Sequence, residues 1–255
     1  MTRSMETGSP QGPGHPQSAA GSQLYFRQLL AGHEFAVSHT VAGRMANFVY
    51  LIGDRLAREC VVVDPAWDVR EVIAAAEGDG MKIVGALATH YHPDHIGGDL
   101  FGLAIEGLRE LMTVRPVPVH ANKEEADGIR FMTGLSPGDV TLHEAGDTLR
   151  VGEIPITLVH TPGHTPGSQC FLVGHRLVSG DTLFVGGCGR VDLPGSDPEE
   201  MYRTLTQRLA RLPGDTVLYP GHHYGPTPSS TLENERRTNQ YLRIRSLEDW
   251  RALMA

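Results

Sequence analysis

The sequence lacks the features that would place the chain in a membrane or in a disulfide-rich fold. Its 255 residues include three cysteines, Cys60, Cys170 and Cys188. This odd number without CxxC spacing fits neither a disulfide framework nor a thiolate metal site. No apolar run approaches the roughly 18 residues of a membrane helix, and the first residues lack the charged and apolar regions of a signal peptide. We therefore expect a protein of the reducing cytoplasm with no membrane association.

Positive charge is also scarce. Lysine and arginine total 22 against 30 acidic residues, which gives a net charge of -8. Because this field repels a phosphate backbone, we expect no nucleic-acid partner. Residues 1–22 are rich in Gly, Pro and Ser and have almost no large apolar side chain, so they predict a disordered tail. For residues 23–255 we favour a single domain, although the length also allows two small ones.

Apolar runs alternate with turn residues along the rest of the chain. Strands are predicted at 48–52, 60–63 and 83–89, with a helix at 68–78 between the last two. A second group of strands is predicted at 154–159, 170–173, 177–178 and 217–219. Ser196 and Glu199 have the spacing of a capping box before a helix at 198–211, and Ser230 and Glu233 repeat it. Two strand-rich halves with interleaved helices predict two sheets packed face to face and covered by helices outside.

The densest group of metal-binding residue types is the segment HYHPDH at 90–95, which directly follows the strand at 83–89. A strand that ends there presents nitrogen and oxygen donors together at the edge of a sheet, as a divalent metal requires. Three imidazoles and a carboxylate side by side are costly to desolvate unless something compensates them. We therefore interpret this segment as part of a metal site.

Three further polar residues stand beside glycine at strand ends: His164, Asp181 and His222. Glycine allows a sharp turn that brings the next side chain toward a shared point. Taken alone, each of the three is better explained as a structural residue or a turn former. Beside the segment at 90–95 they become candidate partners, which only the fold can bring together.

These motifs resemble the metallo-β-lactamase fold superfamily, over about Asn47 to Asn239. They are HxHxDH at 90–95, GHT at 163–165, GDTLF at 180–184 and GH at 221–222. The resemblance implies an α/β fold, an αββα four-layer sandwich with the metal site at the sheet edge. GCGR at 187–190 and the pair His222-x-Tyr224 place the chain nearest the glyoxalase II (hydroxyacylglutathione hydrolase) and persulfide dioxygenase branches.

The resemblance also implies a ligand set. It assigns His90, His92 and His164 to a first metal and Asp94, His95 and His222 to a second, with Asp181 bridging the two. His223 directly follows the expected ligand His222, so the sequence lets it compete for that place. Nitrogen and oxygen ligands without thiolate suit zinc, and also iron or manganese. We expect two divalent metal ions, preferably Zn2+, with Fe2+ and Mn2+ as alternatives.

Two activities use these residues. The first is hydrolysis of a small thioester or ester by a metal-bound hydroxide nucleophile, with Asp94 as a catalytic residue that orients the hydroxide and takes up its proton. The second is a mononuclear iron persulfide dioxygenase, in which the resemblance gives the metal to His90, His164 and Asp181. Arg190 and Asp192 favour the second slightly, because glyoxalase II typically has lysine and tyrosine there. A metal-binding module without catalysis and a penicillin-cleaving role are the weaker alternatives.

Substrate contacts are predicted at Arg190 and Tyr224. Arg190 suits an anionic substrate group, because a guanidinium fits a carboxylate through two hydrogen bonds. The extra residues Asp99–Pro116 predict either a lid over the pocket or a short packed helix. Asp64 and His160 are candidates for orienting ligands. We expect a small-molecule thioester, ester or persulfide substrate, and a homodimer is left open. The sequence assigns no role to three further histidines, at positions 120, 143 and 175.

Overall fold

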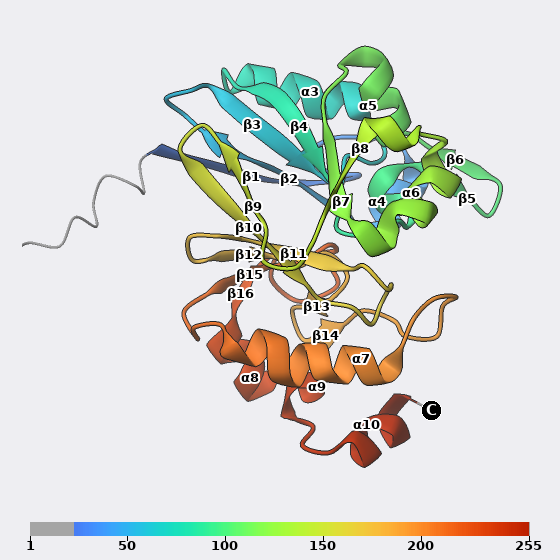
Figure 1. Cartoon of the computed structure of the whole chain (residues 1–255), viewed down its shortest axis with the longest axis vertical. Coiled ribbons are helices and arrows are strands. Elements are labelled where there is room, and N and C mark those ends of the chain that lie inside the picture. Colours follow the sequence, from blue (N-terminus) through green and yellow to red (C-terminus); the bar gives the residue numbers. More distant parts are fainter. Residues whose placement is uncertain (1–22, 255) are drawn as a thin grey trace, which may run out of the picture.

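Two six-stranded sheets face each other in the computed structural model, and helices cover both outer faces (Figure 1). The structure describes residues 23–254, so the predicted disordered tail at 1–22 lies outside the described residues. The αββα four-layer arrangement expected from the sequence is confirmed.

The first sheet has the order β1-β2-β3-β4-β7-β8. Its strands are β1 (Leu24–Leu30), β2 (Phe48–Asp54), β3 (Glu59–Val63), β4 (Lys82–Leu87), β7 (Val119–Asn122) and β8 (Val140–His143). From β3 to β8 neighbouring strands are parallel, and α3 (Val69–Gly78) makes the crossover from β3 to β4. The other helices of this half are α2 (Thr40–Met45), α4 (Pro93–Ile96), α5 (Leu108–Val114) and α6 (Ala126–Thr133).

The second sheet has the order β16-β15-β12-β11-β10-β9. Its strands are β9 (Thr148–Val151), β10 (Ile154–His160), β11 (Gln169–Val173), β12 (Arg176–Val178), β15 (Val217–Tyr219) and β16 (Ser230–Thr231). Helices α7 (Pro198–Arg203), α8 (Leu232–Thr238), α9 (Gln240–Arg243) and α10 (Leu247–Met254) belong to this half, at the bottom of Figure 1. The short hairpin of β13 (Leu183–Phe184) and β14 (Gly187–Cys188) follows β12.

Three buried apolar clusters correspond to the three interfaces between the four layers. The central cluster lies between the sheets and includes Phe48, Tyr50 and Phe171. The alternate residues of β2, Val49 and Leu51, belong to the cluster under the helices of the first half. Burial on both faces explains why β2 is a continuous apolar run instead of an alternating one. A third cluster lies between the second sheet and its helices.

Some predicted boundaries were wrong. Strand β4 ends at Leu87, because Thr89 turns to bond Asp64. The helix predicted at 198–211 is α7 followed by a π-helical turn and a 3-10 turn (η3, Thr204–Arg208; η4, Leu209–Arg211). Its N-cap is Asp197 instead of Ser196, and α8 is capped by Thr231 instead of Ser230.

The extra segment at 99–116 is a small hairpin followed by a helix. Strands β5 (Gly98–Leu100) and β6 (Leu103–Ile105) pair with each other, and α5 begins at Leu108. The turn of this hairpin exposes the whole side chain of Phe101. The predicted packed helix is therefore present, but the hairpin precedes it.

All three cysteines are free, as expected. In the described part of the chain, no helix combines the length and apolar character needed to cross a membrane.

Candidate metal centre

All seven predicted ligands meet at one edge of the two sheets. His90 and His92 lie on the loop after β4, and Asp94 and His95 lie in α4. The other three come from the second sheet: His164 follows β10, Asp181 follows β12 and His222 follows β15. Parallel strands present their carboxyl ends at the same edge, which is how β12 and β15 bring Asp181 and His222 together.

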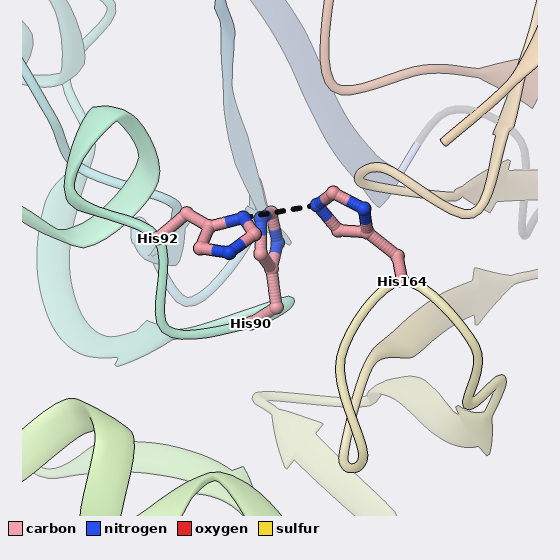
Figure 2. A group of neighbouring side chains, drawn as sticks. All are labelled: His90, His92 and His164. Carbon is pink, nitrogen blue, oxygen red and sulfur yellow. Dashed lines mark hydrogen bonds between the residues drawn. The ribbon is translucent and has the colours of Figure 1, made fainter. Parts of the chain in front are cut away.

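The first group consists of His90, His92 and His164, whose ligand atoms lie within 4.8 Å of one another (Figure 2). Nδ1 of His92 is 2.9 Å from Nε2 of His164. The outer nitrogen of His164, Nδ1, is 2.8 Å from the carbonyl oxygen of Arg190 and donates to it. This bond leaves the lone pair of His164 Nε2 directed at the group.

His90 is fixed in the same way. The Thr89 hydroxyl donates to Asp64 at 2.7 Å, because a carboxylate only accepts. Its oxygen is therefore left to accept from His90 Nδ1, at 2.9 Å. The lone pair of the ring then lies on Nε2, a buried atom without a hydrogen-bond partner.

The second group consists of Asp94, His95 and His222. His95 donates from Nδ1 to Asp64 at 2.9 Å, and His222 donates from Nδ1 to the carbonyl of Met45 at 2.7 Å. Their inner Nε2 atoms, which carry the lone pairs, are only 3.1 Å apart. Two lone pairs at this distance repel each other unless a proton or a metal ion lies between them. His223 lies outside the group and packs on the Phe48 ring, with centroids 5.5 Å apart.

Asp181 lies between the two groups. Its Oδ2 is 3.6 Å from Nε2 of His164 and 3.3 Å from Nε2 of His222. Its Oδ1 is 3.3 Å from Nε2 of His95 but makes no hydrogen bond, although it is buried. The carboxylate is therefore placed to contact ions in both groups.

The ionisable side chains at this edge of the sheets shift one another's pKa values. Burial and the neighbouring rings His95, His92 and His164 hold the pKa of His90 well below its usual range. Burial alone would raise the pKa of Asp181, but the adjacent His222 and His95 lower it well below its usual range. Burial alone would lower the pKa of His95 and of His222, but the adjacent Asp181 carboxylate raises both. A metal must therefore displace a proton from these two rings, because neutral imidazole and ionised carboxylate are the forms that bind metals.

The donor set therefore fits a divalent metal. Two of its buried atoms, His90 Nε2 and Asp181 Oδ1, have no hydrogen-bond partner, and four rings direct lone pairs inward. Buried polar atoms are normally paired, so such atoms indicate a missing partner. Imidazole with carboxylate suits zinc, iron or manganese.

Two glycines allow the loops to approach this closely. Gly180 has a φ of +48°, and a Cβ there would lie 2.6 Å from the Thr89 side chain. A Cβ on Gly221 would overlap Asp181 Oδ1. The glycine context that made Asp181 and His222 candidates in the sequence thus has a steric cause.

Sequence reasoning missed Glu125, which ties the two ligand-bearing loops together. Its carboxylate is fully buried and accepts from the backbone N–H of Tyr91 at 2.8 Å and of Gly167 at 2.6 Å. It also accepts from the Thr165 hydroxyl at 2.8 Å. Burial raises the pKa of Glu125 to about 7, against the effect of these three bonds. Nothing in the sequence around position 125 indicates this role.

Asn47 was missed as well. Its Nδ2 donates to Asp94 at 3.0 Å and lies 3.4 Å and 3.5 Å from Nε2 of His95 and His222. The indole N–H of Trp67 donates to the side-chain oxygen Oδ1 of Asn47 at 3.0 Å, which fixes the orientation of the side-chain amide. Asn47 therefore positions Asp94 within the second group.

The remaining predicted residues lie around the centre. Tyr224 stacks on the His222 ring, with centroids 4.5 Å apart and an interplanar angle of 10°. Arg190 forms a two-bond ion pair with Asp192, at 2.9 Å and 2.8 Å, and both side chains are exposed. Asp64 contacts His95 as predicted, whereas the His160 ring bonds the carbonyl of Pro166 and orients no ligand.

A family model for the metallo-beta-lactamase superfamily matches residues 42–222. The chain therefore belongs to the metallo-beta-lactamase superfamily. This family contains both of the branches that the sequence motifs resemble.

Curated relatives include enzymes of both branches. The chain is 35% identical to the hydroxyacylglutathione hydrolase of Gloeobacter violaceus, over 73% of this chain and 67% of that protein. It is 31% identical to the human mitochondrial persulfide dioxygenase ETHE1, over 82% of this chain and 76% of that protein. Among solved structures, ETHE1 from Myxococcus xanthus has a TM-score of 0.74 and 28% identity, covering 90% of this chain and 89% of that one. The chain thus belongs to an enzyme family whose members include hydrolases and dioxygenases.

Proposed function

We propose that the chain is a metal-dependent hydrolase of a small thioester or ester, with two divalent metal ions, preferably zinc. The observation that carries this proposal is the second donor group. His95 and His222 direct lone pairs at each other across 3.1 Å, with Asp94 beside them. A complete second set of donors is what a two-metal hydrolase needs.

The two ions would be held by His90, His92 and His164 and by Asp94, His95 and His222, with Asp181 between them. When bound, such ions supply an activated water at neutral pH and polarise the carbonyl of the substrate. Four of the five ligand rings, all but that of His92, are held in one tautomer through the outer nitrogen, so little reorganisation is needed on binding.

Side chains of the protein carry out the remaining steps, which are proton transfer and substrate binding. Asp94 accepts the proton of the attacking water at a carboxylate oxygen, and the Asn47 amide keeps that carboxylate oriented. Tyr224 lies flat on His222 and offers an apolar wall for the acyl group or its thiol. Arg190 offers an exposed guanidinium to a substrate carboxylate, once Asp192 releases it.

Metal content and activity together test this proposal. Protein purified without added metal is analysed for zinc, iron and manganese and assayed with S-lactoylglutathione and simple aryl thioesters. We expect about two ions per chain and thioester hydrolysis that a chelator abolishes. One ion per chain with no hydrolysis of any thioester or ester would refute the hydrolase.

The second candidate is a persulfide dioxygenase with one iron. The two buried atoms without partners belong to His90 and Asp181, two of the three residues that the family resemblance gives to a single iron. The named similarity to persulfide dioxygenases also favours it. About one iron per chain with oxygen uptake on glutathione persulfide would establish this activity instead.

A further inference from the structure

A second group of histidines lies on the first sheet, away from the seven residues described above. His120 in β7 and His143 at the end of β8 lie on neighbouring parallel strands. His120 is paired with Thr141, so His143 is two residues further along and faces the same side of the sheet. Within residues 23–254, no side-chain hydrogen bond or ion pair joins this pair to the seven residues of the metal centre.

The two rings meet nitrogen to nitrogen. Nδ1 of His120 is 2.9 Å from Nε2 of His143. The other nitrogen of His143, Nδ1, lies 3.3 Å from a carboxylate oxygen of Asp147. Because the carboxylate accepts from Nδ1, the lone pair of His143 lies on Nε2 and is directed at His120.

This arrangement repeats the one between His92 and His164. There too, one ring is held by an oxygen acceptor on Nδ1 and directs Nε2 at Nδ1 of the second ring, again at 2.9 Å. At His143 the acceptor is a carboxylate, the usual partner of a metal-binding histidine. The carboxylate of Asp147 is itself fixed by the backbone N–H of Glu144 at 3.0 Å.

The surroundings also suit a cation. The side chains of Asp147 and Glu144 are exposed, which gives access from solvent and a negative field, although Glu144 is paired with Lys123 at 2.9 Å. Burial, with a smaller effect of His143, lowers the pKa of His120 to about 4, so its ring is neutral at pH 7. Neutral imidazoles bind zinc, copper and nickel.

We propose that His120 and His143 form a further binding site for a divalent transition metal such as Zn2+, with Asp147 orienting the His143 ring. Two protein ligands leave the other coordination positions of a tetrahedral ion to water. The site is thus open, and it is independent of the function proposed for the metal centre.

The test uses the full-length protein with its metal centre already loaded. Bound zinc per chain is counted after equilibrium dialysis against a series of free zinc concentrations, for the wild type and for His143→Gln. We expect the wild type to bind one zinc more than His143→Gln. Asp147→Asn is expected to bind this zinc about 10–100-fold more weakly. The control is His175→Gln, which removes an exposed imidazole paired with Asp215, and it is expected to match the wild type.

Equal zinc counts for the wild type and His143→Gln would overturn the proposal and leave the pair as a hydrogen bond between two rings. If His143→Gln fails to fold, the wild type still gives an answer by nitrogen NMR of its imidazoles. Zinc is then expected to shift Nδ1 of His120 and Nε2 of His143 together. A proton that stays shared between these two atoms at every zinc concentration would contradict a metal site.

Discussion

Asp64 illustrates how one carboxylate sets the state of several site residues. It accepts from the N–H and the hydroxyl of Thr89 and from His95, and it is itself buried with a left-handed φ of +53°. Through Thr89 it fixes the tautomer of His90, and directly it fixes that of His95. Asp64 thus orients one ligand ring in each of the two groups of the metal centre.

The first prediction concerns this residue. Asp64→Asn replaces an acceptor by an amide that also donates, so the tautomers of His90 and His95 are no longer fixed. Metal affinity is expected to fall about 10–100-fold, which is typical for partners of ligating histidines. Competition with a chromogenic chelator measures it. Asp127→Asn, at an exposed position of α6, serves as the control. Unchanged affinity in Asp64→Asn would show that Asp64 plays no orienting role.

Glu125 carries the second prediction, which concerns stability. The two carboxylate oxygens of Glu125 together accept from three donors. Glu125→Gln replaces one of these oxygens by an NH2 group, so at least one of the three donors is left buried without a partner. We expect a loss of about 2–5 kcal/mol in the free energy of unfolding, because hydrogen bonds to charged groups are strong and buried donors are costly to leave unpaired. Urea denaturation of the metal-free protein measures this loss. Glu124→Gln, the exposed neighbour, should change stability by less than about 0.5 kcal/mol.

At the scale of elements, the loops after the strands determine the geometry of the centre. The first residues of the loop after β15 bring Gly221 against Asp181 and His222 against His95. The backbone also pairs there, because Phe48 N–H donates to the carbonyl of Gly221 at 2.8 Å. This loop therefore has little freedom to accept a larger residue.

We accordingly predict that Gly221→Ala impairs the metal centre more than the fold. The added methyl group overlaps Asp181 Oδ1 and lies 2.9 Å from the backbone carbonyl carbon of Gly180, so the Asp181 carboxylate and the loop that carries it must both shift. Metal analysis after gel filtration should show loss of bound metal, while circular dichroism stays close to that of the wild type. Gly138→Ala adds the same methyl group in open space and should retain its metal. If Gly221→Ala retains its full metal content, the steric explanation is contradicted.

Some of these elements and site residues could be predicted from the sequence, and others could not. Strands β2 and β3 and helix α3 were predictable because their apolar residues match their burial, whereas β1, β8, β9 and β16 were not predicted. The seven donors could be nominated because they follow apolar strands beside glycine. The N-cap residues were predicted one position early, since Asp197 and Thr231 can cap a helix as well as the serines before them. Glu125 and Asn47 could not be found, because the residues to which they hydrogen-bond lie 20 to 47 positions away along the chain.

On the scale of the whole molecule, the metal centre joins two halves of the sandwich. His90, His92, Asp94 and His95 belong to the first half, and His164, Asp181 and His222 belong to the second. Each of the two groups described above takes donors from both halves. Metal binding and packing of the two sheets are therefore linked, and each stabilises the other.

This linkage predicts the effect of metal removal. A ligand at 100–1,000 times its dissociation constant stabilises a protein by about 3–4 kcal/mol. Chelation is therefore expected to lower the unfolding midpoint by roughly 5–15 °C in a chain of this size. Thermal unfolding followed by circular dichroism, with and without added zinc, measures the shift. An identical midpoint for the metal-free and reloaded protein would show that the centre does not couple the halves.

Strand β2 is fastened at both of its ends. At one end, Asn47 and Phe48 are joined to the loop that carries His222. At the other end, Asp54 accepts from the N–H of Glu153 at 2.9 Å, with Gly152 against its side chain. These contacts hold the two sheets together at both ends of β2, so we expect reactants to reach the metal centre without separation of the sheets.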